Sequence, residues 1–232
     1  DIRLREAISD YHKNIYGTDI DPEHILITSG TSPAMLLLFS VLLNPGDEVI
    51  ISDPHYACYA NFISYVQAKP VKVPIYENEG FVFTPESISK KITPATKAIF
   101  INSPANPTGI VIHQDRMKEI VRVAEKNNLY IISDEIYHGL VYEGKAHSIY
   151  EFTDKAFVLN GFSKLFAMTG LRLGYLIAPP EYVRSLQVLQ QNFFICANSI
   201  IQYSGIAALK DAEKEVSTMR ETYNKRRLYM ID

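Results

Sequence analysis

Cysteine is scarce in this sequence, which has only Cys58 and Cys196 in 232 residues. Two isolated cysteines form neither a disulfide framework nor a metal-binding motif, so we expect both to be reduced thiols in a cytosolic protein. The six histidines show no metal-ligand spacing either. The sequence therefore predicts a cytoplasmic protein without a metal site.

Long apolar runs and an excess of positive charge are also missing. No apolar run approaches the length of a membrane span, and we expect neither a membrane partner nor a signal peptide. The formal net charge is −3, so bulk electrostatics do not point to a nucleic-acid partner. A Gly-x-Gly-x-x-Gly motif after a strand and a P-loop are absent as well, which argues against an ordinary nucleotide-binding domain.

What the sequence does contain is a regular alternation of two patterns. Short β-branched runs alternate with segments of helical periodicity, in a chain that is 47% hydrophobic and 21% charged. A helix is also expected in the first residues. The predicted strands are 24–29, 48–52, 70–75, 97–102, 129–133, 156–161 and 172–178, and the predicted helices are 33–43, 55–67, 84–91, 114–127, 180–191, 195–210 and 212–229.

This alternation predicts an α/β fold, a three-layer αβα sandwich around a mostly parallel seven-stranded sheet. Ligands on such sheets bind beyond the carboxyl ends of the strands. The residues that directly follow each predicted strand are therefore the candidates for a functional site.

The first predicted strand is followed by the segment TSGTSPAM. Gly30 permits unusual backbone conformations, Thr31 or Ser32 is a suitable N-cap, and Pro33 suits the first helical position. A helix start preceded by small hydroxyl residues is a natural phosphate site. The simpler alternative is a well-capped helix without a ligand.

The second and fourth predicted strands are followed by the segments DPHYACY and NSPANPTG. Tyr56 is placed to project a ring into the crevice and stack on a flat ligand, or else to be a core tyrosine. Two X-Pro bonds and a glycine mark residues 102–109 as a tightly specified loop in which the Asn106–Pro107 bond is a candidate cis bond. Asn106 can donate a side-chain hydrogen bond; the alternative is a rigid turn.

The fifth predicted strand runs directly into the segment SDEIYHG. Asp134 should therefore lie at the crevice, and Tyr137 follows within one turn if the segment coils. The alternative for Asp134 is a helix N-cap. His138 has no identifiable partner, and we interpret it as a structural or surface residue.

The sixth predicted strand leads into GFSKLFAMTGLRLGY. Ser163 and Lys164 fall at the end of this strand, and Arg172 opens the seventh. Both cations have apolar neighbours, so we expect them to be buried, where an unpaired charge is costly. The segment is either a structural salt bridge or a site that holds an anion and a reactive amine. Together with the residues at the other strand ends, the segment favours a site that binds a flat, phosphorylated heterocycle and whose amine attacks the aldehyde of that heterocycle.

These motifs, in this order and at roughly this spacing, resemble the fold-type I pyridoxal-phosphate enzymes. The resemblance is to the class I and II aminotransferases related to aspartate aminotransferase, and it covers essentially the whole chain. It implies pyridoxal 5′-phosphate as the cofactor. It also implies ping-pong transfer of an amino group between an L-amino acid and a 2-oxo acid.

The resemblance assigns a role to each candidate residue. Lys164 matches the lysine that forms the internal aldimine and then moves the proton from the substrate Cα. Asp134 matches the aspartate that pairs with the pyridinium nitrogen, while Tyr137 and Asn106 match the residues that hydrogen-bond the phenolate oxygen. The remaining matches are the stacking ring of Tyr56, the phosphate ligands Ser163 and Arg172, and the cradle of Gly30, Thr31 and Ser32.

Family members are longer than this chain, with an N-terminal segment and a C-terminal small domain whose arginine grips the substrate carboxylate. We therefore expect a large-domain fragment of low activity. Its expected parts are a helical lead-in (1–23), a cofactor-binding domain (24–211) and the start of the helix that leads to the small domain (212–232). The resemblance also implies a homodimer.

Two other functions remain open on the same scaffold. One is a different pyridoxal-phosphate activity, such as a carbon–sulfur β-lyase or an aminocyclopropane-carboxylate synthase type, although the NPTG motif leans toward aminotransferases. The other is the effector domain of a pyridoxal-phosphate-sensing transcriptional regulator. The sequence has no DNA-binding segment or basic patch to support it.

Overall fold

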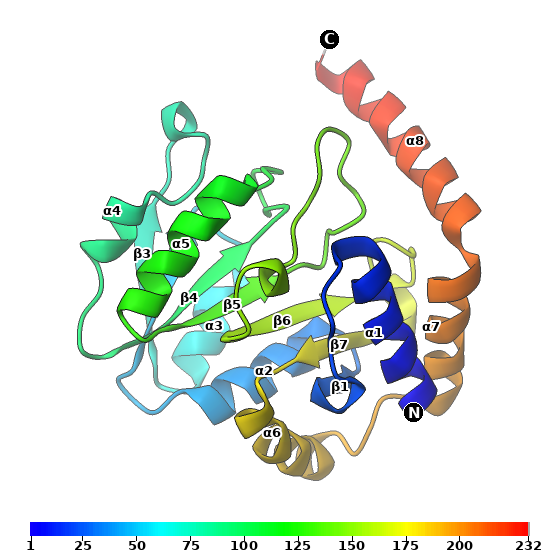
Figure 1. The fold of residues 1–232 in the computed structure, drawn as a ribbon, viewed down its shortest axis with the longest axis horizontal. Coiled ribbons are helices and arrows are strands. Elements are labelled where there is room, and N and C mark those ends of the chain that lie inside the picture. Colours follow the sequence, from blue (N-terminus) through cyan, green and yellow to red (C-terminus); the bar gives the residue numbers. More distant parts are fainter. Residues whose placement is uncertain (232) are drawn as a thin grey trace.

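A computed structural model describes residues 1–231 of the chain (Figure 1); Asp232, the last residue of the expected third segment, lies outside them. All seven predicted strands are present, with ends that shift by no more than two residues. The strands are β1 (Ile25–Thr28), β2 (Glu48–Asp53), β3 (Lys69–Pro74), β4 (Thr96–Asn102), β5 (Tyr130–Asp134), β6 (Ala156–Gly161) and β7 (Gly174–Ile177).

The predicted helices are present too, and the structure moves some of their starts. The helices are α1 (Ile2–Tyr16), α2 (Thr31–Leu42), α3 (Cys58–Tyr65), α4 (Pro85–Ser89), α5 (Gln114–Lys126), α6 (Pro180–Phe193), α7 (Ser199–Asp211) and α8 (Glu213–Ile231), with short 3-10 turns η1 (Pro22–His24), η2 (Glu77–Glu79), η3 (Ile149–Glu151) and η4 (Thr169–Leu171). Helix α7 begins four residues later than predicted because Asn198 caps it, accepting hydrogen bonds from the backbone of Ile200 and Ile201.

The strands form one sheet in the order β1-β7-β6-β5-β4-β2-β3. Strand β7 runs antiparallel to β1 and β6, and the pairs among β2 to β6 are parallel. Gly174 at the start of β7 pairs with Thr28 at the end of β1 and with Gly161 at the end of β6. The start of β7 therefore lies at the same edge as the carboxyl ends of its neighbours.

Helices cover both faces of the sheet, which confirms the predicted three-layer αβα sandwich (Figure 1). Strand β4 shows why: Ile99 and Ile101 pack into the core on the α5 face, and Ala98 and Phe100 pack into the core on the α2 face. Burial of each large apolar side chain stabilises the fold by roughly 1.5–3 kcal/mol. Continuous apolar strands are thus needed because both faces are buried.

The two ends of the chain behave differently. In α1, Leu4 and Ile8 are fully buried in the same core as the sheet. Helix α8 has no buried residue along Glu213–Ile231 and extends away from the sheet (Figure 1). Within residues 1–231, no helix combines the length and apolar character needed to cross a bilayer.

Candidate active site

Asp134 ends strand β5 at the edge of the sheet and is only 4% exposed. Its Oδ2 accepts a 2.7 Å hydrogen bond from the Tyr59 hydroxyl, and its Oδ1 accepts one of 3.1 Å from the Ile136 backbone N–H. Burial raises the pKa of Asp134 to about 6, against the opposing effects of these two hydrogen bonds and of the Lys164 charge. The carboxylate is thus desolvated, fixed in direction and ionised at neutral pH.

The loop after β4 is tied to the end of β5 by Asn102. Its side-chain Nδ2 donates to the Asp134 carbonyl at 2.9 Å, and its Oδ1 accepts from the Asn106 backbone N–H at 2.7 Å. The Asn106–Pro107 bond is cis, as expected. Asn106 Nδ2 then donates to the Tyr137 hydroxyl at 3.4 Å. Asn106 and Tyr137 therefore meet at the carboxyl edge.

Tyr137 lies in the turn 136–139 that follows β5, so the segment does coil as expected. The Lys164 Nζ lies 5.6 Å from the centre of the Tyr137 ring. Lys164 itself is exposed, and so is Arg172, which corrects the expectation that these cations are buried. Their apolar neighbours Leu165 and Leu173 turn into the core instead, and the two cations remain at the surface.

Arg172 approaches the backbone of Gly30 so closely that a Cβ on Gly30 would collide with its guanidinium, with Cζ at 3.0 Å. Gly30 has a φ of 93° and is itself the N-cap of α2, so Thr31 and Ser32 lie inside the first turn and the predicted cap at these residues is wrong. Arg172 does not open β7 as predicted. It precedes the strand in the left-handed conformation, with φ 54°.

A left-handed non-glycine residue is strained by about 1–3 kcal/mol, and such strain gathers at functional sites. Here the guanidinium lies against Gly30 at the start of α2, and its Nη1 donates to the Thr169 carbonyl in η4 at 3.0 Å. Ser163 Oγ lies 3.5 Å from the same Nη1. Ser163, Arg172 and the first turn of α2 therefore lie together at the carboxyl edge of the sheet.

Tyr56 completes the group of predicted residues. It precedes α3, is 41% exposed and meets Tyr59 edge to face at 5.5 Å between ring centres. Cys58 and Cys196 are both free. Among residues 1–231, no group of three histidine, cysteine or acidic side chains is arranged to hold a metal ion.

Several residues of the site were missed in the sequence. Tyr59, Asn102 and Gly174 lie within motifs noted above, but only their three-dimensional contacts give them a part in the site. Gly174 packs so closely on Gly30 that a Cβ would lie 2.7 Å from the Gly30 carbonyl carbon. His138, which had no identifiable partner, is buried and structural, with its Nδ1 2.8 Å from the Tyr16 hydroxyl.

These side chains fit the cofactor that the resemblance implies. Because Gly30 has no Cβ, the guanidinium of Arg172 can lie directly against the start of α2, and the first turn of α2 offers N–H groups there, as suits a phosphate. Asp134 is a buried carboxylate whose hydrogen bonds come from neutral donors, a hydroxyl and a backbone N–H, so it suits a cationic ring nitrogen. Lys164 supplies an accessible amine.

Comparison with known proteins agrees with this site. Residues 1–232 match the profile of the family described as Aminotransferase class I and II. A (5-formylfuran-3-yl)methyl phosphate transaminase from Methanocaldococcus jannaschii is 45% identical over 99% of this chain and 60% of its own length. An aspartate aminotransferase from Pyrococcus horikoshii is 40% identical over 98% of this chain and 59% of its own.

Solved structures show the same similarity. The crystal structure of an aromatic aminotransferase from Pyrococcus horikoshii aligns with a TM-score of 0.95 at 36% identity, over 99% of this chain and 63% of that protein. The chain thus spans only 59–60% of the length of the two relatives above.

Proposed function

This chain belongs to the class I and II aminotransferase family, whose cofactor is pyridoxal 5′-phosphate, and we propose that it is the cofactor-binding part of an amino acid aminotransferase. The observation that carries the proposal is the convergence of Lys164, Tyr137, Asn106 and Asp134 after three adjacent strands. The reaction transfers an amino group between an L-amino acid and a 2-oxo acid.

Lys164 is the proposed catalytic residue. When bound, the cofactor supplies an aldehyde that condenses with amines and a ring that accepts the electron pair left when a bond to Cα breaks. The Lys164 Nζ is accessible for covalent attachment. Once released by an incoming amino acid, the same amine would remove the proton from the substrate Cα as a general base and deliver it, as a general acid, to C4′ of the cofactor.

Asp134, Tyr137 and Asn106 set the electronic environment of the cofactor ring. The carboxylate of Asp134 is held by Tyr59 and the Ile136 N–H, and it keeps a proton on the ring nitrogen. Tyr137 and Asn106, 3.4 Å apart, donate hydrogen bonds to the phenolate oxygen. Tyr56 places its ring beside them as a stacking surface.

A cofactor phosphate would be held by a second group of residues at the same edge of the sheet. Arg172 offers a planar fork of donors with a full positive charge. The proposed cradle around it comprises Gly30, Thr31 and Ser32 at the start of α2, together with Ser163. The backbone N–H groups of the first turn and the helix dipole favour an anion there.

The experiment that tests this proposal is a titration with pyridoxal phosphate in the full-length protein, followed by visible absorption. Borohydride reduction and peptide mass spectrometry then locate any covalent adduct. We expect a visible absorption band and an adduct on Lys164, both lost in Lys164→Ala. No band in the full-length protein, or an adduct on another lysine only, would contradict the proposal.

Several properties of the whole protein are inferred from the family. We infer a homodimer, because large apolar side chains between residues 193 and 203 are exposed, among them Ile195 at 80% and Ile200 at 75%. A cytoplasmic location is in keeping with the two free cysteines. The division into 1–23, 24–211 and 212–232 also remains a proposal, as does low activity of the isolated chain.

The relatives do not favour the other two functions. Those compared above are named as transaminases or aminotransferases, not as carbon–sulfur lyases or transcriptional regulators. A panel of amino acids with the full-length protein would identify the donor. Formation of a 2-oxo acid without release of ammonia is expected for an aminotransferase, whereas a β-lyase releases ammonia.

A further inference from the structure

The last residue of β5, Asp134, and the residue after it, Glu135, place two carboxyl groups on opposite sides of the sheet. Asp134 faces Tyr59 of α3, and the next side chain, Glu135, points to the other face because successive side chains of an extended segment alternate. Glu135 is fully buried. The chemistry proposed above makes no use of it.

The two oxygens of Glu135 have different surroundings. Oε1 accepts three hydrogen bonds, from Ser133 Oγ at 3.0 Å, Ser148 Oγ at 3.2 Å and the Ile149 backbone N–H at 2.9 Å. Oε2 has no hydrogen-bond partner within residues 1–231 and faces His138 Nδ1 at 3.5 Å. An ionised Oε2 would therefore be a buried anion without a donor, which is costly.

His138 brings no positive charge to Oε2. Burial lowers the pKa of His138 to about 3, so its ring is neutral, and burial raises the pKa of Tyr16 on α1, so that hydroxyl keeps its proton. The Nδ1 of His138 lies 2.8 Å from the Tyr16 hydroxyl and 3.5 Å from Oε2. An ionised Oε2 would therefore face a neutral ring whose close hydrogen bond goes to Tyr16.

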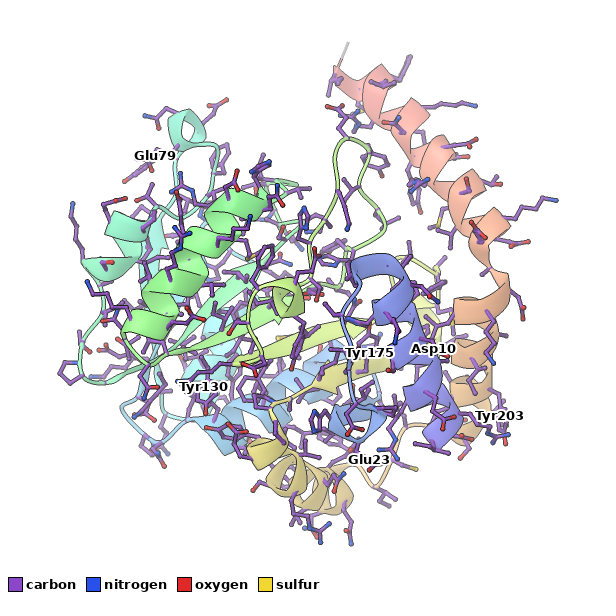
Figure 2. All side chains as sticks on the ribbon, viewed as in Figure 1. Asp10, Glu23, Glu79, Tyr130, Tyr175 and Tyr203 are labelled. Carbon is purple, nitrogen blue, oxygen red and sulfur yellow. The ribbon has the colours of Figure 1, made fainter. Side chains whose placement is uncertain are left out.

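The remaining titratable groups around Glu135 carry no compensating positive charge. Burial lowers the pKa of His12 to about 4, so this residue is neutral as well; its Nε2 contacts the Tyr175 hydroxyl at 3.3 Å, and Figure 2 labels Tyr175 beside α1. The titratable groups near Glu135 are Asp134 and His138 from its own segment, Tyr16 from α1, Tyr175 from β7 and Tyr150 from η3. His12 and the His147–Glu151 pair lie further out, around His138 and Tyr16. The described residues bring no lysine or arginine to this group.

We propose that Glu135 is a positioning residue that carries its proton on Oε2, so that the negative charge at the end of β5 is confined to Asp134. The proposal rests on the function proposed above, in which Asp134 must be ionised to pair with the ring nitrogen. When the surroundings of two neighbouring carboxyl groups separate their pKa values, one group stays protonated and the other is ionised. Here Glu135 is the protonated group and Asp134 the ionised one. Burial, with a smaller contribution from the adjacent Asp134, raises the pKa of Glu135 to about 8, against the lowering effect of the three hydrogen bonds to its carboxyl group.

The protonation of Glu135 can be measured through its effect on stability. A group whose pKa is raised on folding contributes stability that is complete below its unfolded value, near 4.3, and is lost as the pH rises toward its folded value. Glu135→Gln keeps the shape without a titrating proton. We expect the unfolding equilibrium constant of the wild-type protein to rise relative to that of the variant, by up to about tenfold per pH unit between roughly pH 5 and 8. A ratio that is constant across this range would overturn the proposal.

Infrared spectroscopy gives a second, direct readout. At pH 7 we expect a carboxylic-acid carbonyl band in the wild-type protein that is missing in Glu135→Gln and still present in Glu151→Gln. The control removes a carboxyl of the neighbouring turn η3 that is paired with His147 at 2.9 Å. If Glu135→Gln does not fold, the wild-type band alone decides: loss of the band as the pH passes about 8 supports the proposal, and its absence at pH 7 overturns it.

The cofactor enters only in the final comparison. At pH 7, Glu135→Gln should bind pyridoxal phosphate within about threefold of wild type. The charge on Asp134 is unchanged in this variant, and any change in the pKa of Asp134 stays below one unit. A loss beyond about tenfold would show that Glu135 acts as an anion and overturn the proposal. If the wild-type protein binds no pyridoxal phosphate at all, the proposed function fails, while the infrared and unfolding results still decide where the proton is.

Discussion

The hydroxyl of Tyr59 donates a hydrogen bond to Asp134 Oδ2 at 2.7 Å. Helix α3 therefore holds the carboxylate at the end of β5, and the same bond favours its ionised form. Because Tyr59 is 3% exposed, water cannot easily replace this donor. The interaction links the packing of a helix to the charge of the proposed cofactor site.

Tyr59→Phe should raise the pKa of Asp134 above its value of about 6. A hydrogen bond to a charged group contributes about 1.5–3 kcal/mol, which corresponds to a shift of about one to two pH units. Binding of a cationic ring needs the ionised carboxylate. As the pH is lowered, the affinity for pyridoxal phosphate should therefore begin to fall at a higher pH in the variant than in the wild-type protein. Titrations from pH 5 to 8 measure this shift.

The control for this experiment is Tyr65→Phe. Tyr65 lies on the same helix and is 75% exposed, so its pH profile should match that of the wild-type protein. Superimposable profiles for Tyr59→Phe and Tyr65→Phe would refute the role given to the Tyr59 hydroxyl.

Gly174→Ala should disrupt the phosphate side of the site. The added Cβ would lie 2.7 Å from the Gly30 carbonyl carbon and 3.0 Å from the Thr31 nitrogen, both backbone atoms that cannot rotate away. Overpacking of this kind costs about 1–3 kcal/mol, so denaturant unfolding should show a loss of this size together with weaker cofactor binding. Gly170→Ala is the matched control, because nothing lies within 4 Å of its Cβ. Equal stability of the two variants would contradict the prediction.

Arg172→Lys should weaken the binding of pyridoxal phosphate even though it keeps the charge. Lysine cannot form the planar fork, and one lost charged hydrogen bond of about 1.5–3 kcal/mol corresponds to roughly 10- to 150-fold in affinity. Competition by inorganic phosphate should weaken in parallel. Both residues have the same strain in the left-handed conformation, so the comparison isolates the head group.

The control is Arg184→Ala on the exposed surface of α6, which should leave both affinities unchanged. A cofactor affinity of Arg172→Lys equal to that of wild type would remove Arg172 from the phosphate site.

The sequence predicted the sheet and its layers well because the strands are apolar on both faces and hydrophobic periodicity records that burial directly. It placed Asp134, Lys164 and Arg172 at one edge by a simple rule about parallel sheets. Helix starts were less accurate. Gly30 caps α2 through its backbone conformation and without a side-chain hydrogen bond. A prediction based on side-chain hydroxyl groups therefore places the cap at Thr31 or Ser32 instead.

Contacts between distant segments were out of reach of the sequence. Tyr59 meets Asp134 across 75 positions, and Tyr16 meets His138 across 122, and no local pattern reports such pairs. The exposure of Lys164 and Arg172 was misjudged for a related reason. Apolar neighbours in the chain do not imply burial when the chain turns at a strand end and alternate residues point in different directions.

Ile195→Lys should separate the subunits if the exposed apolar side chains near α7 form the homodimer interface. Phe193, Ile195, Ile200 and Tyr203 are each more than half exposed, and a buried lysine there would lack a partner. We expect light scattering to show the dimer mass for the wild-type full-length protein and the monomer mass for the variant at micromolar concentration. Tyr65→Lys places the same charge on another exposed aromatic side chain and should remain dimeric. If Ile195→Lys keeps the dimer mass, the interface lies elsewhere, and if the wild-type protein is monomeric at all concentrations, the homodimer proposal is wrong.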